Sequence, residues 1–298
     1  MIRSMEDLKK SVINMNKKKI ALVAAEDDEL LELVERAQGL NLAEFILLGD
    51  RTKIEKIASE NNRKCDCEII DEPDNKKAAE KAVDLVISGE AGALMKGLLL
   101  TSTFLKAVLN KEKGLNTGKI ISQISVFDTE FGEGLQFVTD CAMVIQPNLT
   151  EKKQIIENAV SLARKLGYEK PKVALISAVE VVNPAINDTM EAAVLSKMAD
   201  RGQIKNAIVD GPFALDNAIS AEAAEHKGIK GEVAGCADIL VVPNLQVGNV
   251  LSKAITYYGH KDVASAVVGA EVPIVMTSRT DSVNSKLLSI ALVNYISS

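Results

Sequence analysis

The chain has 298 residues, of which 47% are hydrophobic and 26% charged, a balance typical of a soluble globular protein with one large domain or two medium ones. The formal net charge of −6 argues against a nucleic-acid partner, because such a partner requires a basic face. No hydrophobic run reaches the roughly 18 residues of a membrane span and the polar N-terminus contains no signal-peptide core, so we expect no membrane contact and a cytoplasmic protein.

The hydrophobic residues are mostly aliphatic, since aromatic residues make up only 3% and tryptophan is absent. A core of this kind suits a buried parallel sheet, whose strands read as continuous aliphatic runs. The cysteines form no disulfide framework, and neither histidine is near the CxC pair in the sequence, so we expect structural thiols and no metal site. The cysteines are Cys65, Cys67, Cys141 and Cys236.

In the first part of the chain, short aliphatic runs alternate with amphipathic stretches. This alternation predicts repeated strand–helix units and a parallel sheet covered by helices. The predicted strands are 19–24, 45–48, 68–70 and 93–95, and the predicted helices are 27–37, 52–60, 76–87 and a segment after Thr101.

The middle of the chain breaks this alternation. Two neighbouring strands, 119–127 and 135–138, are separated by the glycine-rich segment FGEG at 131–134, which suits a hairpin or a crossing point. A long helix over 151–166 follows, and the alternation then resumes. The later strands are predicted over 172–176, 207–210, 239–242 and 274–276, and the later helices over 189–199, 215–225, 247–258 and 282–295.

Two sets of strand–helix units separated by an irregular segment predict two α/β lobes, with a first boundary near residue 140. Ligand sites in such sheets lie beyond the carboxyl ends of the strands. Polar or glycine-rich residues directly after a strand are therefore the first candidates for site residues.

One such group follows the strand at 93–95. Lys96 ends this strand, and Thr101 and Ser102 stand where a helix begins, with Lys106 one turn further. Hydroxyl residues at a helix start can simply cap it. They can also bind an anion there, because free backbone amides and the helix dipole favour a phosphate.

A second group lies between the last strand and the last helix. Ser278, Arg279 and Asp281 bring a hydroxyl, a guanidinium and a carboxylate to one turn. The planar fork of arginine matches phosphate. The alternative is a helix cap, Asp281 or Ser282, beside a solvated arginine.

Three further candidates follow later strands. Asp210 ends a predicted strand, in a turn made of ordinary turn residues. Asn244 follows Pro243, and Asn249 lies beside Gly248 within the start of a helix, where glycine costs about 1 kcal/mol relative to alanine. Such a glycine indicates either the close approach of a ligand or chain segment, or close helix packing.

Several familiar catalytic motifs are absent. The sequence has no dinucleotide-binding glycine motif in a strand–turn–helix context, no Walker phosphate loop and no GxSxG nucleophile elbow. The two histidines lie in ordinary surroundings, which disfavours a Ser-His-Asp triad. Neither a nicotinamide enzyme nor a hydrolase has positive support.

Four segments together resemble the phosphate acetyl/butyryltransferase family. They occur in the family's order over nearly the whole chain, and the motifs VPNLxxGNxLxK and SRxDSxxSKLLSIA are more specific together than any one motif. The chain length and the KLLSIA ending look like the butyryl branch. The segments are KGLLLTSTFLKAVL (96–109), IVDGPFALDNAI (208–219), ADILVVPNLQVGNVLSK (237–253) and PIVMTSRTDSVNSKLLSIAL (273–292).

The resemblance implies an α/β fold similar to isocitrate and isopropylmalate dehydrogenases, with two α/β/α lobes and a cleft between them. The first lobe would comprise 1–138 plus 278–298, with the C-terminal helix returning to it. The second lobe, 139–277, would form most of the contact in a homodimer or larger homo-oligomer.

The implied activity is the reversible transfer of a short acyl group: butyryl-CoA plus phosphate gives butyryl phosphate plus CoA. Coenzyme A and phosphate would be substrates, with no metal or redox cofactor. A partner acid kinase would use the acyl phosphate to make ATP.

The resemblance also implies roles for individual residues. Ser278 and Arg279 match the family's active-site Ser-Arg pair, and Thr101 matches a hydroxyl near phosphate. Lys106 stands where acetyl-specific members have an arginine. Ser285 stands where they have a catalytic aspartate, so Asp281 is the substitute candidate for the base. Lys96, Ser102, Asp210, Asn244 and Asn249 complete the expected substrate-binding residues.

Three alternatives stay open. Acyl-chain length depends on the lining of a pocket, so acetyl-CoA is a possible substrate. A dehydrogenase of the same fold would bind a divalent metal and NAD, although the sequence lacks a clustered aspartate pattern for the metal. The third alternative is a non-catalytic binding protein with this fold. The joint presence of Ser278, Arg279 and Thr101 argues against it.

Overall fold

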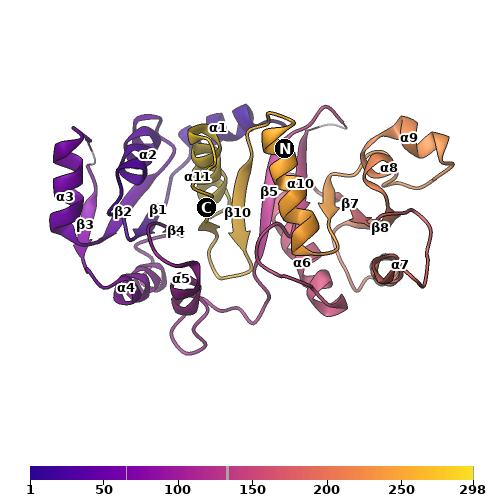
Figure 1. Ribbon diagram of the computed structural model, residues 1–298, viewed down its shortest axis with the longest axis horizontal. Coiled ribbons are helices and arrows are strands. Elements are labelled where there is room, and N and C mark those ends of the chain that lie inside the picture. The colour runs from indigo at the N-terminus through magenta and orange to yellow at the C-terminus, as the bar shows by residue number, and fades with distance from the viewer. Residues whose placement is uncertain (65, 132–133, 298) are drawn as a thin grey trace. The chain divides into compact units, whose positions relative to one another are not determined.

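The computed structural model describes residues 1–64, 66–131 and 134–297 (Figure 1). The chain divides into two compact units. The central unit comprises 1–5 and 120–263, and the terminal unit comprises 6–119 and 264–298. A compact unit need not coincide with a lobe, so the lobe bounds predicted above stay a prediction. Cys65 of the CxC pair and residues 132–133 of the FGEG segment lie outside the described residues.

The terminal unit contains a sheet in the order β3-β2-β1-β4-β11-β10. Neighbouring strands are parallel except for β10 and β11, which are antiparallel. Four of the five residues of β1 are fully buried, as expected for an aliphatic strand covered on both faces. The strands are β1 (Lys19–Val23), β2 (Glu44–Gly49), β3 (Glu68–Asp71), β4 (Ala93–Lys96), β10 (Ala264–Val268) and β11 (Ile274–Val275).

Aspartates start three of the helices that follow these strands. Asp27, Asp50 and Asp74 each accept a hydrogen bond from a backbone N–H of the first turn, which satisfies donors that the helix itself leaves unpaired. The strands β1, β2 and β3 are therefore each followed by a sharply defined helix start. The helices are α1 (Met5–Ile13), α2 (Asp28–Gly39), α3 (Arg51–Glu60), α4 (Asn75–Ile87) and α5 (Thr101–Val108).

The last helix, α11 (Val283–Ser297), belongs to the core of the terminal unit. It packs against β10, β11, β4 and α2. Its residues from Leu287 to Asn294 are all buried, which explains why the sequence LLSIALVN is apolar on nearly every side. Elements from both ends of the chain thus share one core.

The central unit has a sheet in the order β5-β6-β9-β7-β8. β5 and β6 form an antiparallel pair, which confirms the two neighbouring strands predicted for the middle of the chain, and the other pairs are parallel. The strands are β5 (Ser122–Asp128), β6 (Leu135–Thr139), β7 (Lys172–Ile176), β8 (Ile208–Phe213) and β9 (Ile239–Val241).

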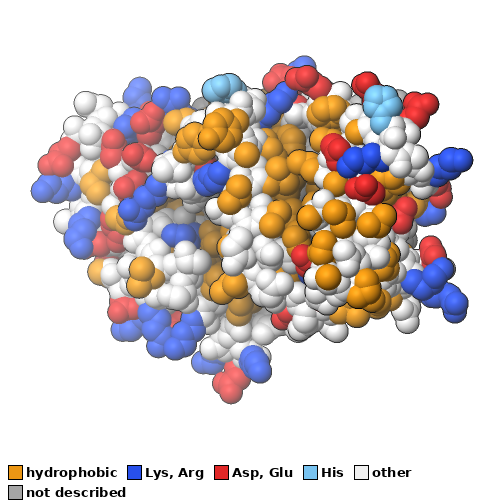
Figure 2. Space-filling model, turned by 45° about the vertical axis from the view of Figure 1, so that its right-hand side comes forward, with side chains coloured by type: hydrophobic (Ala, Val, Ile, Leu, Met, Phe, Trp, Pro, Cys, Tyr) orange, Lys and Arg blue, Asp and Glu red, His pale blue; other side chains and the backbone are white. Residues whose placement is uncertain are grey.

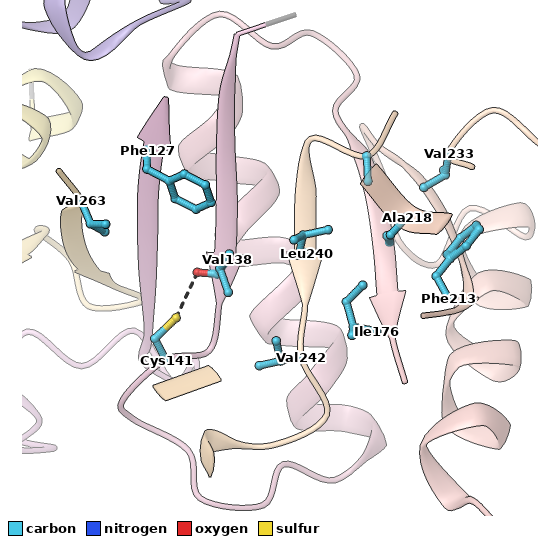
Figure 3. Packing of buried hydrophobic residues seen from close by; sticks show 12 residues of the cluster. Phe127, Val138, Cys141, Ile176, Phe213, Ala218, Val233, Leu240, Val242 and Val263 are labelled. Atoms are coloured by element: carbon cyan, nitrogen blue, oxygen red, sulfur yellow. Dashed lines mark hydrogen bonds between the residues drawn. The ribbon is translucent and has the colours of Figure 1, made fainter. Parts of the chain in front are cut away.

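The core of the central unit lies between this sheet and two of its helices (Figure 3). Phe127, Val138 and Leu240 project from neighbouring strands into one cluster. Partly buried Ile219 and Leu251 pack onto it from the helices. The helices of this unit are α6 (Leu149–Lys165), α7 (Asn187–Asp200), α8 (Leu215–Ile219), α9 (Ala221–His226) and α10 (Leu245–Tyr257).

The predicted α/β class with mostly parallel strands is confirmed, but three details of the elements differ. The sequence analysis did not predict β10 or α1. The strand predicted to end on Asp210 continues to Phe213, and the helix predicted over 215–225 is two helices. Ser220 has extended backbone angles and its hydroxyl caps α9, so it separates α8 from α9. No helix among the described residues is long and apolar enough to span a membrane.

Candidate active site

An open cavity of about 290 Å³ lies in the terminal unit, where the parallel strands β4 and β11 end. Three segments line it: the first turn of α2, the loop after β4, and the loop after β11 together with the start of α11. The carboxyl ends of neighbouring parallel strands meet at one edge of a sheet, so residues 96–98 and 277–279 lie together although they are far apart in the sequence.

Three cationic side chains line this cavity: Lys96, Arg279 and Lys286. Lys96 is half-buried, and its ammonium donates to the carbonyls of Gly97 at 3.1 Å and Leu99 at 2.9 Å. Burial lowers the pKa of Lys96, and the nearby Arg279 guanidinium lowers this pKa further. A cluster of this kind favours an anion, because an anion relieves the repulsion among its cations.

Lys286 connects two walls of the cavity. Its Nζ lies 3.4 Å from the carbonyl oxygen of Arg279 and 3.6 Å from the carboxylate of Glu29 on α2. Glu29 is mostly exposed, so this ion pair is weak and leaves the lysine able to meet an incoming anion. The sequence analysis quoted Lys286 only within the SKLLSIA motif and gave it no role, and it did not consider Glu29.

The loop after β4 runs very close to the end of β1. The N–H of Gly97 donates to the carbonyl of Val23, and the N–H of Leu98 donates to that of Ala24, both at 2.8 Å. A Cβ on Gly97 would lie 2.3 Å from the Ala24 oxygen and 2.4 Å from the Val23 oxygen. Only glycine fits this position, and it fixes the loop that carries Lys96.

The loop after β11 is held by its own side chains. The Asp281 carboxylate accepts a hydrogen bond of 2.8 Å from the N–H of Ser278. The Ser278 hydroxyl lies 3.0 Å from the hydroxyl of Thr280. Ser282 caps α11, since its hydroxyl accepts from the N–H of Ser285 at 3.0 Å. Of the two residues expected as possible caps of this helix, Ser282 is the cap. Asp281 instead shapes the turn that presents Ser278 and Arg279.

Thr101, Ser102 and Lys106 all lie exposed on α5, which follows the same loop, and none of them lines the cavity. Leu100 occupies the N-cap position, and no side chain in the described part of the chain caps this helix start. The first amides of α5 can therefore meet solvent or a ligand. A role for these three residues in binding phosphate stays a prediction.

The remaining candidates belong to the central unit. Asp210 lies within β8, and its carboxylate accepts from the N–H of Gly211 at 2.8 Å, while burial raises the pKa of this carboxyl group. Asn244 caps α10 by accepting from the N–H of Val247 at 3.0 Å, and Asn249 is exposed on the same helix. Gly248 packs against the backbone of Asp140, which accounts for a glycine inside a helix.

Cys141 is 2% exposed, and burial raises the pKa of its thiol to about 12. Its Sγ donates to the carbonyl of Val138 (Figure 3). Thiolates are the nucleophilic form of cysteine, so Cys141 should be inert. We expect iodoacetamide at pH 8 to leave Cys141 unlabelled in the folded protein and to label it in urea, as peptide mass spectrometry would detect. Rapid labelling of Cys141 in the folded protein would contradict its burial.

Within the described ranges, no group of three or more His, Cys, Asp or Glu side chains is arranged to hold a metal ion. The cavity provides positive charge and a hydroxyl at Ser278, and the Asp281 carboxylate lies next to it in the turn, where it accepts from the N–H of Ser278. Such a set can bind a phosphate-sized anion and stabilise negative charge on a reacting oxygen or sulfur.

Comparison with known proteins gives consistent results. The family model "Phosphate acetyl/butaryl transferase" matches residues 61–294. A phosphate butyryltransferase of Clostridium acetobutylicum is 49% identical over 98% of this chain and 97% of its own length. A phosphate acetyltransferase of Thermotoga maritima is 44% identical over 92% of this chain and 94% of its own length. A solved branched-chain phosphotransacylase of Enterococcus faecalis has a TM-score of 0.82 at 35% identity, covering 94% of this chain and 99% of that one.

Proposed function

Because the chain belongs to the phosphate acetyl/butyryl transferase family, a family of acyltransferases, we propose that it is a phosphate butyryltransferase. It transfers a butyryl group reversibly, so that butyryl-CoA and phosphate give butyryl phosphate and CoA. The observation that carries this proposal is the cavity at the ends of β4 and β11, where Lys96, Arg279 and Lys286 surround a space suited to phosphate.

In this mechanism Arg279 binds the phosphate with its planar fork, and Lys96 and Lys286 neutralise the remaining charge. Thr101, Ser102 and Lys106 add hydroxyl and ammonium donors from the start of α5, with Lys106 acting as a point charge. Asp210, Asn244 and Asn249 contribute to binding the rest of the substrates. Binding both substrates side by side supplies much of the acceleration, since it turns a bimolecular reaction into a reaction within one complex.

The chemical step is a direct attack. A phosphate oxygen forms a bond to the thioester carbonyl carbon, and the carbon–sulfur bond breaks as CoA leaves. The Ser278 hydroxyl donates a hydrogen bond to the developing oxyanion or to the leaving sulfur. In the reverse direction Asp281 takes the proton of the CoA thiol. No acyl-enzyme forms, and the inert thiol of Cys141 agrees with this, because it cannot act as a nucleophile.

The same family membership supports the setting of the reaction. The protein works in the cytoplasm, in butyrate metabolism, as a homodimer. Its immediate supplier is an enzyme that makes a short acyl thioester of CoA, and its immediate consumer is a kinase that transfers the phosphoryl group of an acyl phosphate. The metabolic setting, the supplier and the consumer follow from the substrate in the name of the C. acetobutylicum relative, whereas the cytoplasmic location and the homodimer follow from the family resemblance alone.

Purified protein should release free CoA thiol from butyryl-CoA only when phosphate is present, and faster than from acetyl-CoA. A thiol reagent measures both rates. Each methylene contributes about 1–3 kcal/mol to discrimination and butyryl has two more than acetyl, so we expect a preference of about 30-fold or more. Faster release from acetyl-CoA would support the same acyl transfer to phosphate, but with acetyl-CoA as the substrate. The name of the T. maritima relative, a phosphate acetyltransferase, favours this alternative. No phosphate-dependent release from either substrate would remove the proposal.

The direct attack has a separate test. With labelled CoA, butyryl-CoA and no phosphate, the label should not exchange into the thioester, since no acyl group is held on the protein between half-reactions. Exchange at a rate comparable with turnover would indicate an acyl-enzyme and would contradict this mechanism.

A further inference from the structure

The cavity at the ends of β4 and β11 has an apolar wall that the binding of phosphate does not use. Leu30 and Leu33 of α2 and Leu98 of the loop after β4 line the cavity. Leu33 is 2% exposed, Leu30 is half-buried and Leu98 is 43% exposed. These side chains therefore continue the core of the terminal unit into the cavity. We call these three residues the leucine wall.

Backbone hydrogen bonds fix the position of the leucine wall. The N–H of Leu98 donates to the carbonyl of Ala24 at 2.8 Å. On α2, the N–H of Leu30 donates to the capping carboxylate of Asp27 at 3.0 Å. Leu30 and Leu33 lie three residues apart and therefore on one face of the helix. A wall that is held in this way can discriminate between ligands by their size, because little of it is free to move aside.

The cations of the cavity lie beside this wall. Lys96 and Leu98 are two residues apart in the loop after β4. Leu30 directly follows Glu29, which pairs with Lys286 at 3.6 Å. The volume of about 290 Å³ is close to that of the smallest small-molecule sites, about 300 Å³, which combine apolar walls with a few placed polar groups. A cavity with a charged side and an apolar side fits a ligand that is charged at one end and apolar at the other.

The leucine wall also differs from the surface of its own unit. Figure 2 shows charged side chains of both signs spread over the left of the view, the side on which Figure 1 labels α2, α3 and α4. A single exposed leucine on such a surface needs no explanation. Three leucines that line one cavity together with three cations point instead to a ligand with an apolar part.

We propose that the leucine wall binds the acyl chain of the substrate and sets the chain length that the protein accepts. This inference rests on the proposed acyl transfer and adds the residues that determine its substrate. With phosphate held by Arg279 and the reacting carbonyl at Ser278, the carbons beyond the carbonyl lie along Leu30, and the end of a butyryl chain meets Leu98. Butyryl extends two carbons further than acetyl and therefore buries apolar surface on the wall that acetyl does not reach.

The test compares acetyl-CoA, butyryl-CoA and hexanoyl-CoA as substrates in the assay of phosphate-dependent thiol release. Leu98→Trp fills the space at the outer end of the wall and should lower the ratio of kcat/KM for butyryl-CoA to that for acetyl-CoA by about 10-fold or more. Leu98→Ala opens this space and should raise the ratio for hexanoyl-CoA to butyryl-CoA by about 10-fold. Opposite shifts in chain-length preference are expected of a side chain that meets the end of the chain.

Leu40 provides the matched controls. It is a leucine of the same unit, 49% exposed directly after α2, and it does not line the cavity. Leu40→Trp and Leu40→Ala should retain both ratios of the wild type. Circular dichroism and the thermal midpoint check that each variant is folded. Leu30→Phe narrows the same wall from α2 and should also lower the ratio for butyryl-CoA to acetyl-CoA, so the test does not depend on the folding of Leu98→Trp.

The outcomes separate this inference from the proposed function. Ratios that stay unchanged in Leu98→Trp, Leu98→Ala and Leu30→Phe would overturn the inference and leave the acyl transfer standing. An equal loss with all of the thioesters would overturn it too, since the wall would then contact a part that they share, such as the pantetheine arm of CoA. A wild type that releases no thiol in a phosphate-dependent way would overturn the proposed function, and this inference with it.

Discussion

Arg279→Ala should lower kcat/KM for phosphate by about 10²–10³-fold. Arg279 is exposed at the cavity beside Lys96 and Lys286, and it offers the only planar fork among the three cations. Its loss removes two parallel charge-assisted hydrogen bonds to phosphate, which one lysine cannot replace. Phosphate-dependent thiol release from butyryl-CoA at varied phosphate concentration measures the effect.

Two further variants make this result specific. Arg279→Lys keeps the charge and should recover only part of the activity, because the fork is lost. Arg201→Ala removes an exposed arginine of the central unit and should leave turnover unchanged. The thermal midpoint of Arg279→Ala should match that of the wild type, since its side chain is exposed. Near-normal turnover in Arg279→Ala would show that Arg279 does not bind the phosphate.

Gly97→Ala should both destabilise the protein and abolish most of its activity. The added Cβ would lie 2.3 Å from a backbone oxygen, closer than any real contact of this type. The loop after β4 must shift, which breaks its hydrogen bonds to Val23 and Ala24 and displaces Lys96. We expect a loss of about 2–4 kcal/mol in the free energy of unfolding, measured by urea denaturation.

The control for this variant is a glycine with space around it. Gly39 ends α2, and no atom lies within 4 Å of the position that its Cβ would take. Gly39→Ala should therefore leave stability unchanged or raise it by up to about 1 kcal/mol, since alanine favours the helix. Equal stability of Gly97→Ala and the wild type would show that the β4 loop tolerates a side chain.

The alternation of strands and helices was predictable because buried strands must be aliphatic on both faces. The strand KIALV at 19–23 satisfies this rule in four consecutive residues, 20–23. β10 was not predicted because its sequence, ASAVV, is short and contains a serine and two alanines, which weaken the aliphatic pattern of a buried strand. The N–H of Ser265 donates to the hydroxyl of Ser289 on α11 at 2.9 Å, a contact that no local pattern reveals.

The candidate site was predictable in part. The rule that ligand sites lie beyond the carboxyl ends of strands pointed to Lys96, Ser278 and Arg279. These three residues line one cavity in the structure. Lys286 and Glu29 were missed because each lies on a helix, where a charged residue usually faces solvent. Their contribution depends on how α2 and α11 pack, which is a property of the tertiary structure.

The discontinuous terminal unit has a consequence for synthesis of the protein. Strand β4 lies between β1 and β11 in the sheet, but β11 is made some 180 residues after it, as the residue numbers of the two strands show. During translation β4 is therefore an open sheet edge, able to pair with other nascent chains, while the central unit emerges and folds. The sheet closes, and the loop that carries Ser278 and Arg279 reaches Lys96, only after α11 has left the ribosome. Termination shortly before β10 would thus yield a protein with a folded central unit, an exposed β4 edge and no assembled phosphate cavity.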